Sequence, residues 1–303
     1  MTDAEDVRAF WQDLGLPGII DLHVHFLPPP IERAVWREFD AAGPLIGRPW
    51  PIRYRGPQEE RLAFLRDAGV RAFPTLPYAH KPGVATYLND WSRDLAAAEP
   101  DVLRSATFYP EPEAAAYVAR LVADGVQVFK AHLQVGAFHL DDPLLEPVWG
   151  TLAEAGTPVV VHAGSGPVGT PYTGPASTAR VLARHPGLRL VVAHMGVPES
   201  AEFLALAERY GGVLLDTSMA FTEFFADGPH GHFPADLVPR LRDLQDRVVW
   251  GSDFPTLPFA YREQLDALAG LGLGDDWLRD VVWNNAAELL GRESPARSRG
   301  CDP

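Results

Sequence analysis

The chain has 303 residues and a 47% hydrophobic content, enough for one large α/β domain with an extensive core. Its 40 acidic residues outnumber 26 Lys and Arg, and the formal net charge of -14 argues against nucleic acid or an anionic membrane as the main partner. A single cysteine, Cys301, excludes an internal disulfide and a cysteine metal site.

The N-terminal residues and the lengths of the apolar runs predict a cytoplasmic protein. Residues 1–6 are acidic and do not resemble a secretory signal. No apolar run approaches the length needed to cross a bilayer. We therefore expect a small-molecule substrate, with neither nucleic acid nor a membrane as partner, and the sequence leaves a homo-oligomer open.

Short apolar runs alternate with amphipathic segments along the whole chain. The apolar runs predict strands at 19–25, 71–76, 102–108, 126–132, 158–162, 189–194, 213–217 and 248–252. Helical spacing of apolar residues predicts helices at 58–69, 83–98, 112–123, 143–156, 175–185, 199–210, 235–245, 260–271 and 276–290. Strands that alternate with helices in this way indicate parallel βαβ units.

The α/β pattern fits a closed (β/α)8 TIM barrel better than an open Rossmann-type sheet. The open sheet would place a Gly-x-Gly-x-x-Gly turn after its first strand, whereas this chain has Phe26-Leu27-Pro28-Pro29-Pro30 there. We therefore predict a single barrel domain over residues 1–291, with a long loop after strand 1, and a disordered tail over 292–303.

Reactive side chains end four of the predicted strands. His23 and His25 end the first strand, and they point to one face because a strand alternates its faces with period two. His162, His194 and Asp253 follow the apolar runs of three later strands. The active site of such a barrel gathers at the C-terminal ends of its strands, so the predicted fold brings all five side chains together. Imidazole and carboxylate groups of this kind bind zinc and similar ions.

These motifs resemble the amidohydrolase superfamily, in particular the amidohydrolase-related branch that includes aminocarboxymuconate-semialdehyde decarboxylase. The matching segments, within a resemblance over about 19–290, are Asp21-Leu22-His23-Val24-His25, Val161-His162-Ala163-Gly164, Ala193-His194-Met195-Gly196 and Gly251-Ser252-Asp253-Phe254-Pro255. The resemblance implies one divalent metal ion, zinc being the first choice, bound by His23, His25, His162 and Asp253. It also implies that His194 acts on water activated by this metal, so that His194 and Asp253 are the catalytic residues.

Lys130 and His132 share one face of the predicted fourth strand. Superfamily members with two metals use a carbamylated lysine on this strand as a bridge, and Lys130 could play that part, with His162 and His194 then serving the second ion. Alternatively, Lys130 pairs with a carboxylate or binds a substrate anion. His132 is either a substrate contact or a packed barrel histidine.

Aromatic and apolar residues after the strands are expected to line the pocket, which predicts a partly apolar or aromatic substrate. They are Phe26, Tyr78, Tyr109, Met219, Phe221 and Phe254.

Two long segments leave the predicted barrel, at 26–57 and 218–233. The first contains seven prolines and lacks clear periodicity, so we expect a lid over the metal face that is held in shape without a helix or strand. Trp36, Phe39 and Trp50 give this lid apolar side chains with which to dock. The second contains His230-Gly231-His232, whose glycine-rich setting makes a preformed metal site improbable.

Three functions are compatible with these residues. The leading one is a metal-dependent hydrolase that uses metal-activated water on an amide, lactone or ester of a small, partly apolar substrate. The first alternative is a non-oxidative decarboxylase of an unsaturated or aromatic carboxylic acid. Decarboxylases of this branch tend to carry a glycine run after the strand-six histidine, whereas only Gly196 lies there, which slightly favours the hydrolase. The second alternative is a non-catalytic metal- or ligand-binding barrel, which would not need His194 beside the metal.

Overall fold

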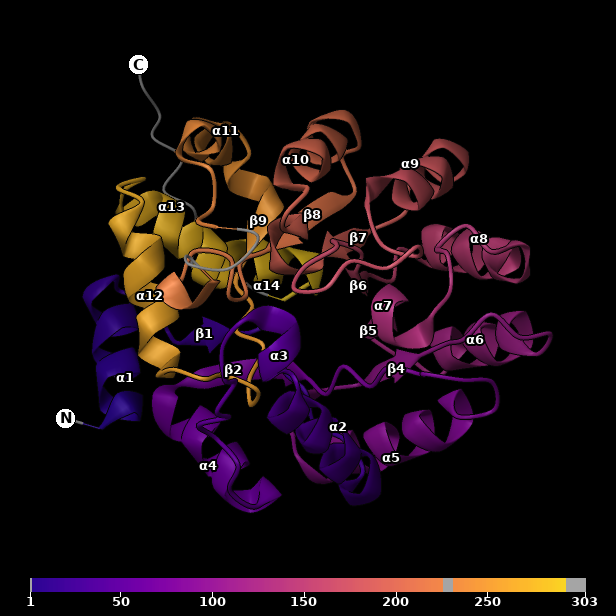
Figure 1. Cartoon of the computed structure of the whole chain (residues 1–303), viewed down its shortest axis with the longest axis horizontal. Helices are drawn as coiled ribbons and strands as arrows, with labels where there is room; N and C mark the ends of the chain where they lie inside the picture. The colour runs from indigo at the N-terminus through magenta and orange to yellow at the C-terminus, as the bar shows by residue number, and fades with distance from the viewer. Residues whose placement is uncertain (1, 226–230, 293–303) are drawn as a thin grey trace.

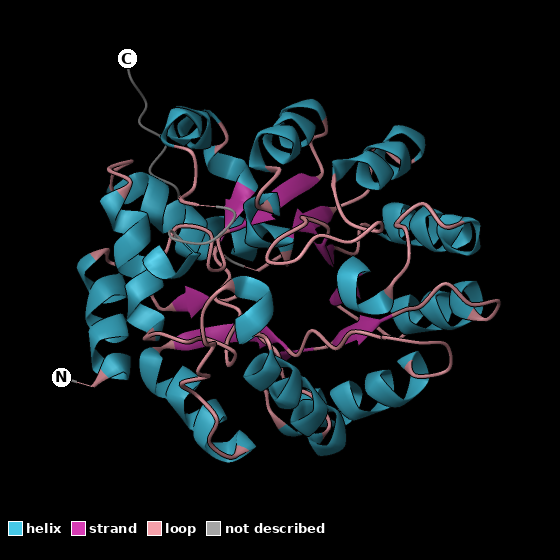
Figure 2. Ribbon diagram, viewed as in Figure 1, coloured by secondary structure: helices cyan, strands magenta, loops and turns pink. Residues whose placement is uncertain are grey.

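A ring of parallel strands surrounded by helices forms the body of the molecule, as Figures 1 and 2 show in the computed structural model. The structure describes residues 2–225 and 231–292. The (β/α)8 fold predicted from the sequence is confirmed. His230 and the predicted disordered tail beyond Arg292 lie outside the described residues.

The strands are shorter than the apolar runs that predict them. They form two parallel ladders, β1-β2-β3 and β4-β5-β6-β7-β8-β9. Their bounds are β1 Ile19–Ile20, β2 Val70–Pro74, β3 Val102–Leu103, β4 Ser105–Thr107, β5 Val128–His132, β6 Val159–His162, β7 Leu190–Val192, β8 Val213–Asp216 and β9 Val248–Val249. The run at 102–108 is thus divided into two strands by Arg104.

Backbone hydrogen bonds connect the beginning of the ring to its end. Beyond β1, the Leu22 N–H donates to Trp250 O at 3.0 Å and the His25 N–H donates to Phe254 O at 2.7 Å. The Asp253 N–H donates to His23 O at 2.8 Å, and Val24 forms a parallel bridge with Phe254. These contacts place the His-x-His segment beside the segment after β9, although neither segment is a regular strand.

Helices cover the outside of the ring (Figure 1). Those that follow the predicted pattern are α4 Gln58–Ala68, α5 Ala85–Ala98, α6 Ala114–Ala123, α8 Glu146–Ala155, α9 Pro175–Arg184, α10 Ser200–Arg209, α11 Val238–Asp243 and α12 Tyr261–Gly270. The pattern at 276–290 becomes α13 Asp275–Arg279, a π-helical turn and α14 Asn285–Leu289. The sequence analysis did not predict α1 Asp3–Asp13 or the short α7 Leu133–Gly136.

The expected loop at 26–57 is wrong in one respect, because it contains α2 Pro29–Ala41 and α3 Gly43–Ile46. Prolines occupy the first turn of both helices, where the missing N–H removes no intrahelical hydrogen bond. These prolines therefore mark two helix starts rather than an irregular loop.

Alternation along the strands produces two separate cores. On β5, Phe129 and Ala131 pack outward with the helices, whereas Val128 packs in a cluster with Val160 and Val191 of the next two strands. Ala286 and Ala287 of α14 belong to this inner cluster and cover one end of the barrel. The inward positions after Val128 and Val160 are occupied by polar side chains, which are thereby held at the C-terminal end of the barrel.

Candidate active site

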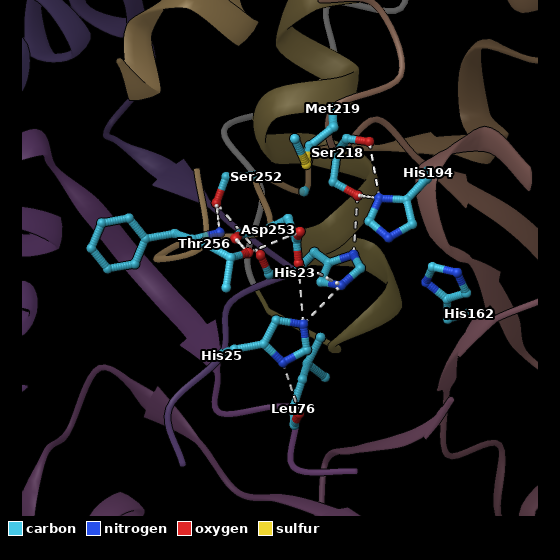
Figure 3. A network of polar contacts seen from close by, with 12 residues as sticks. His23, His25, Leu76, His162, His194, Ser218, Met219, Ser252, Asp253 and Thr256 are labelled. Carbon is cyan, nitrogen blue, oxygen red and sulfur yellow. Dashed lines mark hydrogen bonds and ion pairs between the residues drawn. The ribbon is translucent and has the colours of Figure 1, made fainter. Parts of the chain in front are cut away.

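Three potential metal ligands converge at the C-terminal end of the barrel (Figure 3). The Nε2 atoms of His23 and His25 lie 3.2 Å apart. Oδ1 of Asp253 lies 3.5 Å from His23 Nε2 and 3.2 Å from His25 Nε2. These three residues, which we call the metal group, join the first strand segment to the segment after β9, as the sequence analysis expected.

Hydrogen bonds on the far side of each ring aim the two Nε2 atoms into this group. Nδ1 of His25 donates to Leu76 O at 2.9 Å, and Nδ1 of His23 donates to Asp216 Oδ2 at 2.8 Å. Each Nε2 then carries a lone pair. Two lone pairs and a carboxylate oxygen that face one another repel unless a cation lies among them, so these residues fit a divalent metal ion.

The protonation states of His23, His25 and Asp253 also favour metal binding, since ligands must be deprotonated to bind a metal. Burial, with help from the charge of Lys130, lowers the pKa of His23 to about 3. Burial also lowers the pKa of His25, so both imidazoles are neutral at pH 7. Burial works to raise the pKa of Asp253, but the close imidazoles of His25, His23 and His194 outweigh burial and hold this pKa well below its usual range.

Asp216 is a site residue that the sequence analysis missed. Its Oδ2 holds His23, while Oδ1 accepts hydrogen bonds from the backbone N–H groups of His194 at 3.0 Å and Ser218 at 3.1 Å. The Ser218 hydroxyl also donates to Oδ1. Because both oxygens are engaged, Asp216 orients the site rather than offering a free metal ligand. The available signal was its place at the end of β8, like the other reactive residues.

Asp21 stabilises the His23-Val24-His25 motif through hydrogen bonds. Its Oδ1 accepts hydrogen bonds from the backbone N–H groups of His23 at 3.0 Å and Ser252 at 3.1 Å. Its Oδ2 accepts the hydroxyl of Tyr261 on α12 at 2.7 Å. One buried carboxylate thus ties the segment that carries His23 to the segment that carries Asp253.

His194 lies beside the metal group and is held through Nδ1. This nitrogen lies 2.7 Å from Ser218 Oγ and 3.1 Å from Ser218 O, and the His194 ring centroid is 4.8 Å from that of His23. A donor Nδ1 leaves a lone pair on Nε2, which suits a proton acceptor that faces the cavity.

His162 stands apart from the three converging ligands. Its Nε2 donates to Gly166 O at 2.9 Å, and its ring stacks on His132 with centroids 4.1 Å apart, because the two residues are register partners on β5 and β6. Its ring centroid lies 4.9 Å from that of His194. No ligand group within the described residues includes His162, so its role as a metal ligand stays a prediction.

Lys130 is fully buried at the base of the site. Its Nζ lies 3.1 Å from His23 Nε2, and burial lowers its pKa to about 8. The lysine therefore faces the metal group as both sequence-based hypotheses require, and metal bridging and anion binding both stay predictions. His132 lines the cavity next to it.

Left-handed backbone conformations concentrate around this site. Positive φ angles occur at His194 (56°), Met195 (54°) and Asp253 (67°), and also at Leu76 and Met219. Residues other than glycine pay a steric cost there, and such conformations cluster at functional sites. Here they turn the chain sharply at the strand ends, so that His194 and Asp253 face the cavity.

The cavity at the metal group has a volume of about 660 Å³, and Tyr78 and Met219 line it, as predicted. The expectation that Phe26 and Phe254 line it is corrected, because both are fully buried against other aromatic rings beneath its wall. Tyr109 and Phe221 also lie outside the cavity lining, the former donating its hydroxyl to Gly136 O at 3.1 Å and the latter packing on Phe233. His232 reaches the lining, and its partner His230 is not described.

One wall of the cavity comes from the segment that contains α2 and α3. Trp36, Phe39 and Trp50 all line it, and Phe39 packs edge-on against Trp50 with ring centroids 4.9 Å apart. Trp50 Nε1 donates to Thr256 O at 2.7 Å, which attaches the segment close to Asp253. The segment therefore covers the metal face, where the lid was expected; closure over a substrate stays a prediction.

Sequence comparison identifies the family. The model of the amidohydrolase family (Amidohydro_2) matches residues 20–292. The chain belongs to the amidohydrolase family. Enzymes of this superfamily generally depend on metals, and this amidohydrolase carries His and Asp groups that can bind one. A search of curated proteins gave no significant match.

Solved structures of low sequence identity share the fold. An uncharacterised TIM-barrel protein from Bordetella bronchiseptica has a TM-score of 0.72 at 21% identity, covering 90% of this chain and 98% of its own. A 5-carboxyvanillate decarboxylase from Sphingomonas paucimobilis has a TM-score of 0.64 at 19% identity, covering 91% and 100%. A probable 2-pyrone-4,6-dicarboxylic acid hydrolase from Acinetobacter baumannii has a TM-score of 0.57 at 14% identity, covering 90% and 99%.

Among the described residues of this amidohydrolase, no helix is both long and apolar enough to span a membrane.

Proposed function

We propose that this amidohydrolase is a zinc-dependent hydrolase that adds water to an amide, lactone or ester of a small, partly apolar substrate. The convergence of His23 Nε2, His25 Nε2 and Asp253 Oδ1 beside His194 carries this proposal. We include His162 as a fourth ligand from the other side of the site. One ion per chain is proposed, and a second ion would require Lys130 to be carbamylated.

In the proposed reaction, each residue of the site has a separate role. A divalent ion held by these ligands would supply Lewis-acid activation of water and of the substrate carbonyl. His194 accepts a proton at Nε2 during attack and returns it to the leaving group, while Ser218 holds its other nitrogen. Asp216 keeps His23 in the tautomer that a ligand needs. The helical wall of α2 and α3 excludes water from the reacting groups, which strengthens their electrostatic interactions.

Decarboxylation of an aromatic or unsaturated acid is the second candidate, and the apolar wall favours it. Ile31, Val35, Trp36, Phe39 and Ile46 line the cavity over the polar base. An apolar setting disfavours a carboxylate relative to uncharged carbon dioxide. The 5-carboxyvanillate decarboxylase and the 2-pyrone-4,6-dicarboxylic acid hydrolase that share this fold are, by name, proteins of these two reaction classes.

A substrate panel on the zinc-loaded enzyme tests the choice. Aryl esters, γ-lactones, anilides and hydroxybenzoic acids would be assayed with wild-type enzyme and with the Asp253→Asn variant as an inactive control. Hydrolysis of an ester, lactone or amide by wild type alone supports the hydrolase. Release of carbon dioxide from an aromatic acid, without hydrolysis of the other classes, contradicts it and supports the decarboxylase.

A further inference from the structure

The cavity is divided into a polar base and apolar walls. The base holds the metal group with Lys130 and His132, whereas the walls come from α2, α3 and the loops after the strands. A volume of about 660 Å³ is in the range of sites that bury a drug-sized ligand. A molecule that fills this cavity therefore has one polar end and a large apolar body.

The apolar lining continues to the mouth of the cavity. The described chain exposes four large hydrophobic side chains, and two of them, Leu45 at 70% and Val135 at 44%, line this cavity. They come from α3 and α7, which lie on either side of the barrel centre in Figure 1. The other two, Tyr87 and Leu144, lie outside the lining. Exposed apolar groups that continue a ligand cavity mark an extension of the binding surface.

Tyr78 supplies an unused hydrogen-bond donor at the base. Its ring stands edge-on to His25 and tilted on His132, with centroids 5.4 Å and 5.2 Å away. Its hydroxyl has no hydrogen-bond partner among the described residues, whereas the hydroxyls of Tyr54 and Tyr261 donate to Asp3 and Asp21. Tyr78 is half-buried and lines the cavity, so its hydroxyl is free to donate a hydrogen bond to an acceptor on a ligand there.

We propose that the substrate is an amphipathic carbonyl or carboxyl compound. Its oxygen accepts a hydrogen bond from Tyr78, and its long apolar group extends out of the cavity between Leu45 and Val135. The proposal rests on the proposed function, because it takes the metal group as the place of reaction. It goes beyond that function in making Tyr78 a catalytic residue that touches the substrate and in requiring an apolar group long enough to reach the mouth.

Binding of 4-alkylbenzoates to the zinc-loaded enzyme tests the proposal without turnover. Titration calorimetry would follow the series from 4-methyl to 4-hexyl. We expect affinity to rise about 2–4-fold with each methylene until the chain reaches the mouth. The Leu45→Ser/Val135→Ser variant should lose this gain for the longest chains alone, and Leu144→Ser is its matched control.

The Tyr78→Phe variant keeps the ring and removes the donor. We expect about 10-fold weaker binding of every member of the series, with Tyr87→Phe as the matched control. An affinity that does not change with chain length, wild-type affinity in Tyr78→Phe, or no binding to wild type would each overturn the proposal. Because binding is measured apart from catalysis, the expected pattern in an enzyme that hydrolyses no ester, lactone or amide would reject only the hydrolase.

Discussion

Asp216 is not one of the proposed metal ligands, yet its hydrogen bonds orient both His23 and His194. Its carboxylate holds the His23 ring through Oδ2 and the His194 backbone through Oδ1. The sequence predicted His23, His25 and Asp253 from strand ends, and the structure brings these three together. Asp216 also ends an apolar run, but this position alone does not show which ring it will meet, so its role in orienting His23 was not predicted.

Substitution of Asp216 by Asn should weaken metal binding by roughly 10–100-fold, because the amide cannot accept from His23 with the charge that fixes its tautomer. Competition with a chelator of known affinity measures the change. Asp243→Asn, at an exposed position on α11, is the control. Unchanged affinity in Asp216→Asn would show that His23 needs no such support.

Substitution of His194 by Ala should leave the metal in place and lower turnover by roughly 10²–10⁴-fold, the usual contribution of a general base. Metal content and rate should be measured on the same preparation. His185→Ala removes a histidine that pairs with Glu146 on the outer surface and serves as control. Loss of the metal together with activity would make His194 a ligand instead.

Among the elements, α12 connects the periphery to the site. Its Tyr261 reaches Asp21, and Gln264 bridges the Ser252 carbonyl at 2.9 Å and the Met219 N–H at 2.7 Å. The residue before α12, Ala260, has no side chain that can cap the helix. Asp3 of α1 takes this place, accepting from the N–H groups of Tyr261 at 3.0 Å and Arg262 at 3.1 Å.

Replacement of Asp3 by Ala should therefore destabilise the fold by about 1–2 kcal/mol, as for loss of a helix cap. Denaturant unfolding measures the difference. Asp13→Ala, at the other end of the same helix, removes an exposed acidic group without a capping role and should change stability little. Equal stability of Asp3→Ala and wild type would show that α12 does not depend on this cap.

The limits of sequence-based prediction also lie at the element scale. Long periodic helices such as 58–68 and 85–98 were predicted closely because each buries one face against the barrel. The α2–α3 segment was expected to be a loop because of its prolines and its lack of clear periodicity, and the helical spacing of Ile31, Val35 and Phe39 was missed. The β1 strand proved short because hydrogen bonds to Trp250 and Phe254, far along the chain, shape the segment after Ile20.

At the scale of the molecule, the alternation of strands and helices predicted the barrel, and the barrel predicted which residues meet. The cavity walls were not predictable in the same way. Phe26 and Phe254 follow strands but turn into the outer core, whereas Trp36 and Leu45 reach the cavity from a segment without a barrel role. Such placements depend on packing between distant segments rather than on local pattern.

Metal binding should also stabilise the whole fold, because three buried acceptors otherwise face one another at the barrel end. At a free zinc concentration 100 times the dissociation constant, the expected gain is about 2.7 kcal/mol. Thermal unfolding with zinc and after chelator treatment measures it. The Asp253→Asn variant should lose most of this increment, and an equal increment in that variant would place the stabilising ion elsewhere.

Elemental analysis of the protein purified without chelator tests the central claim, that the chain holds a divalent ion through His23, His25 and Asp253. We predict one equivalent per chain, predominantly zinc, and much less in Asp253→Asn prepared in parallel. A second equivalent would favour the pair of ions bridged by Lys130. A wild-type protein that contains no metal and takes up none when zinc, manganese or cobalt is supplied would contradict the account.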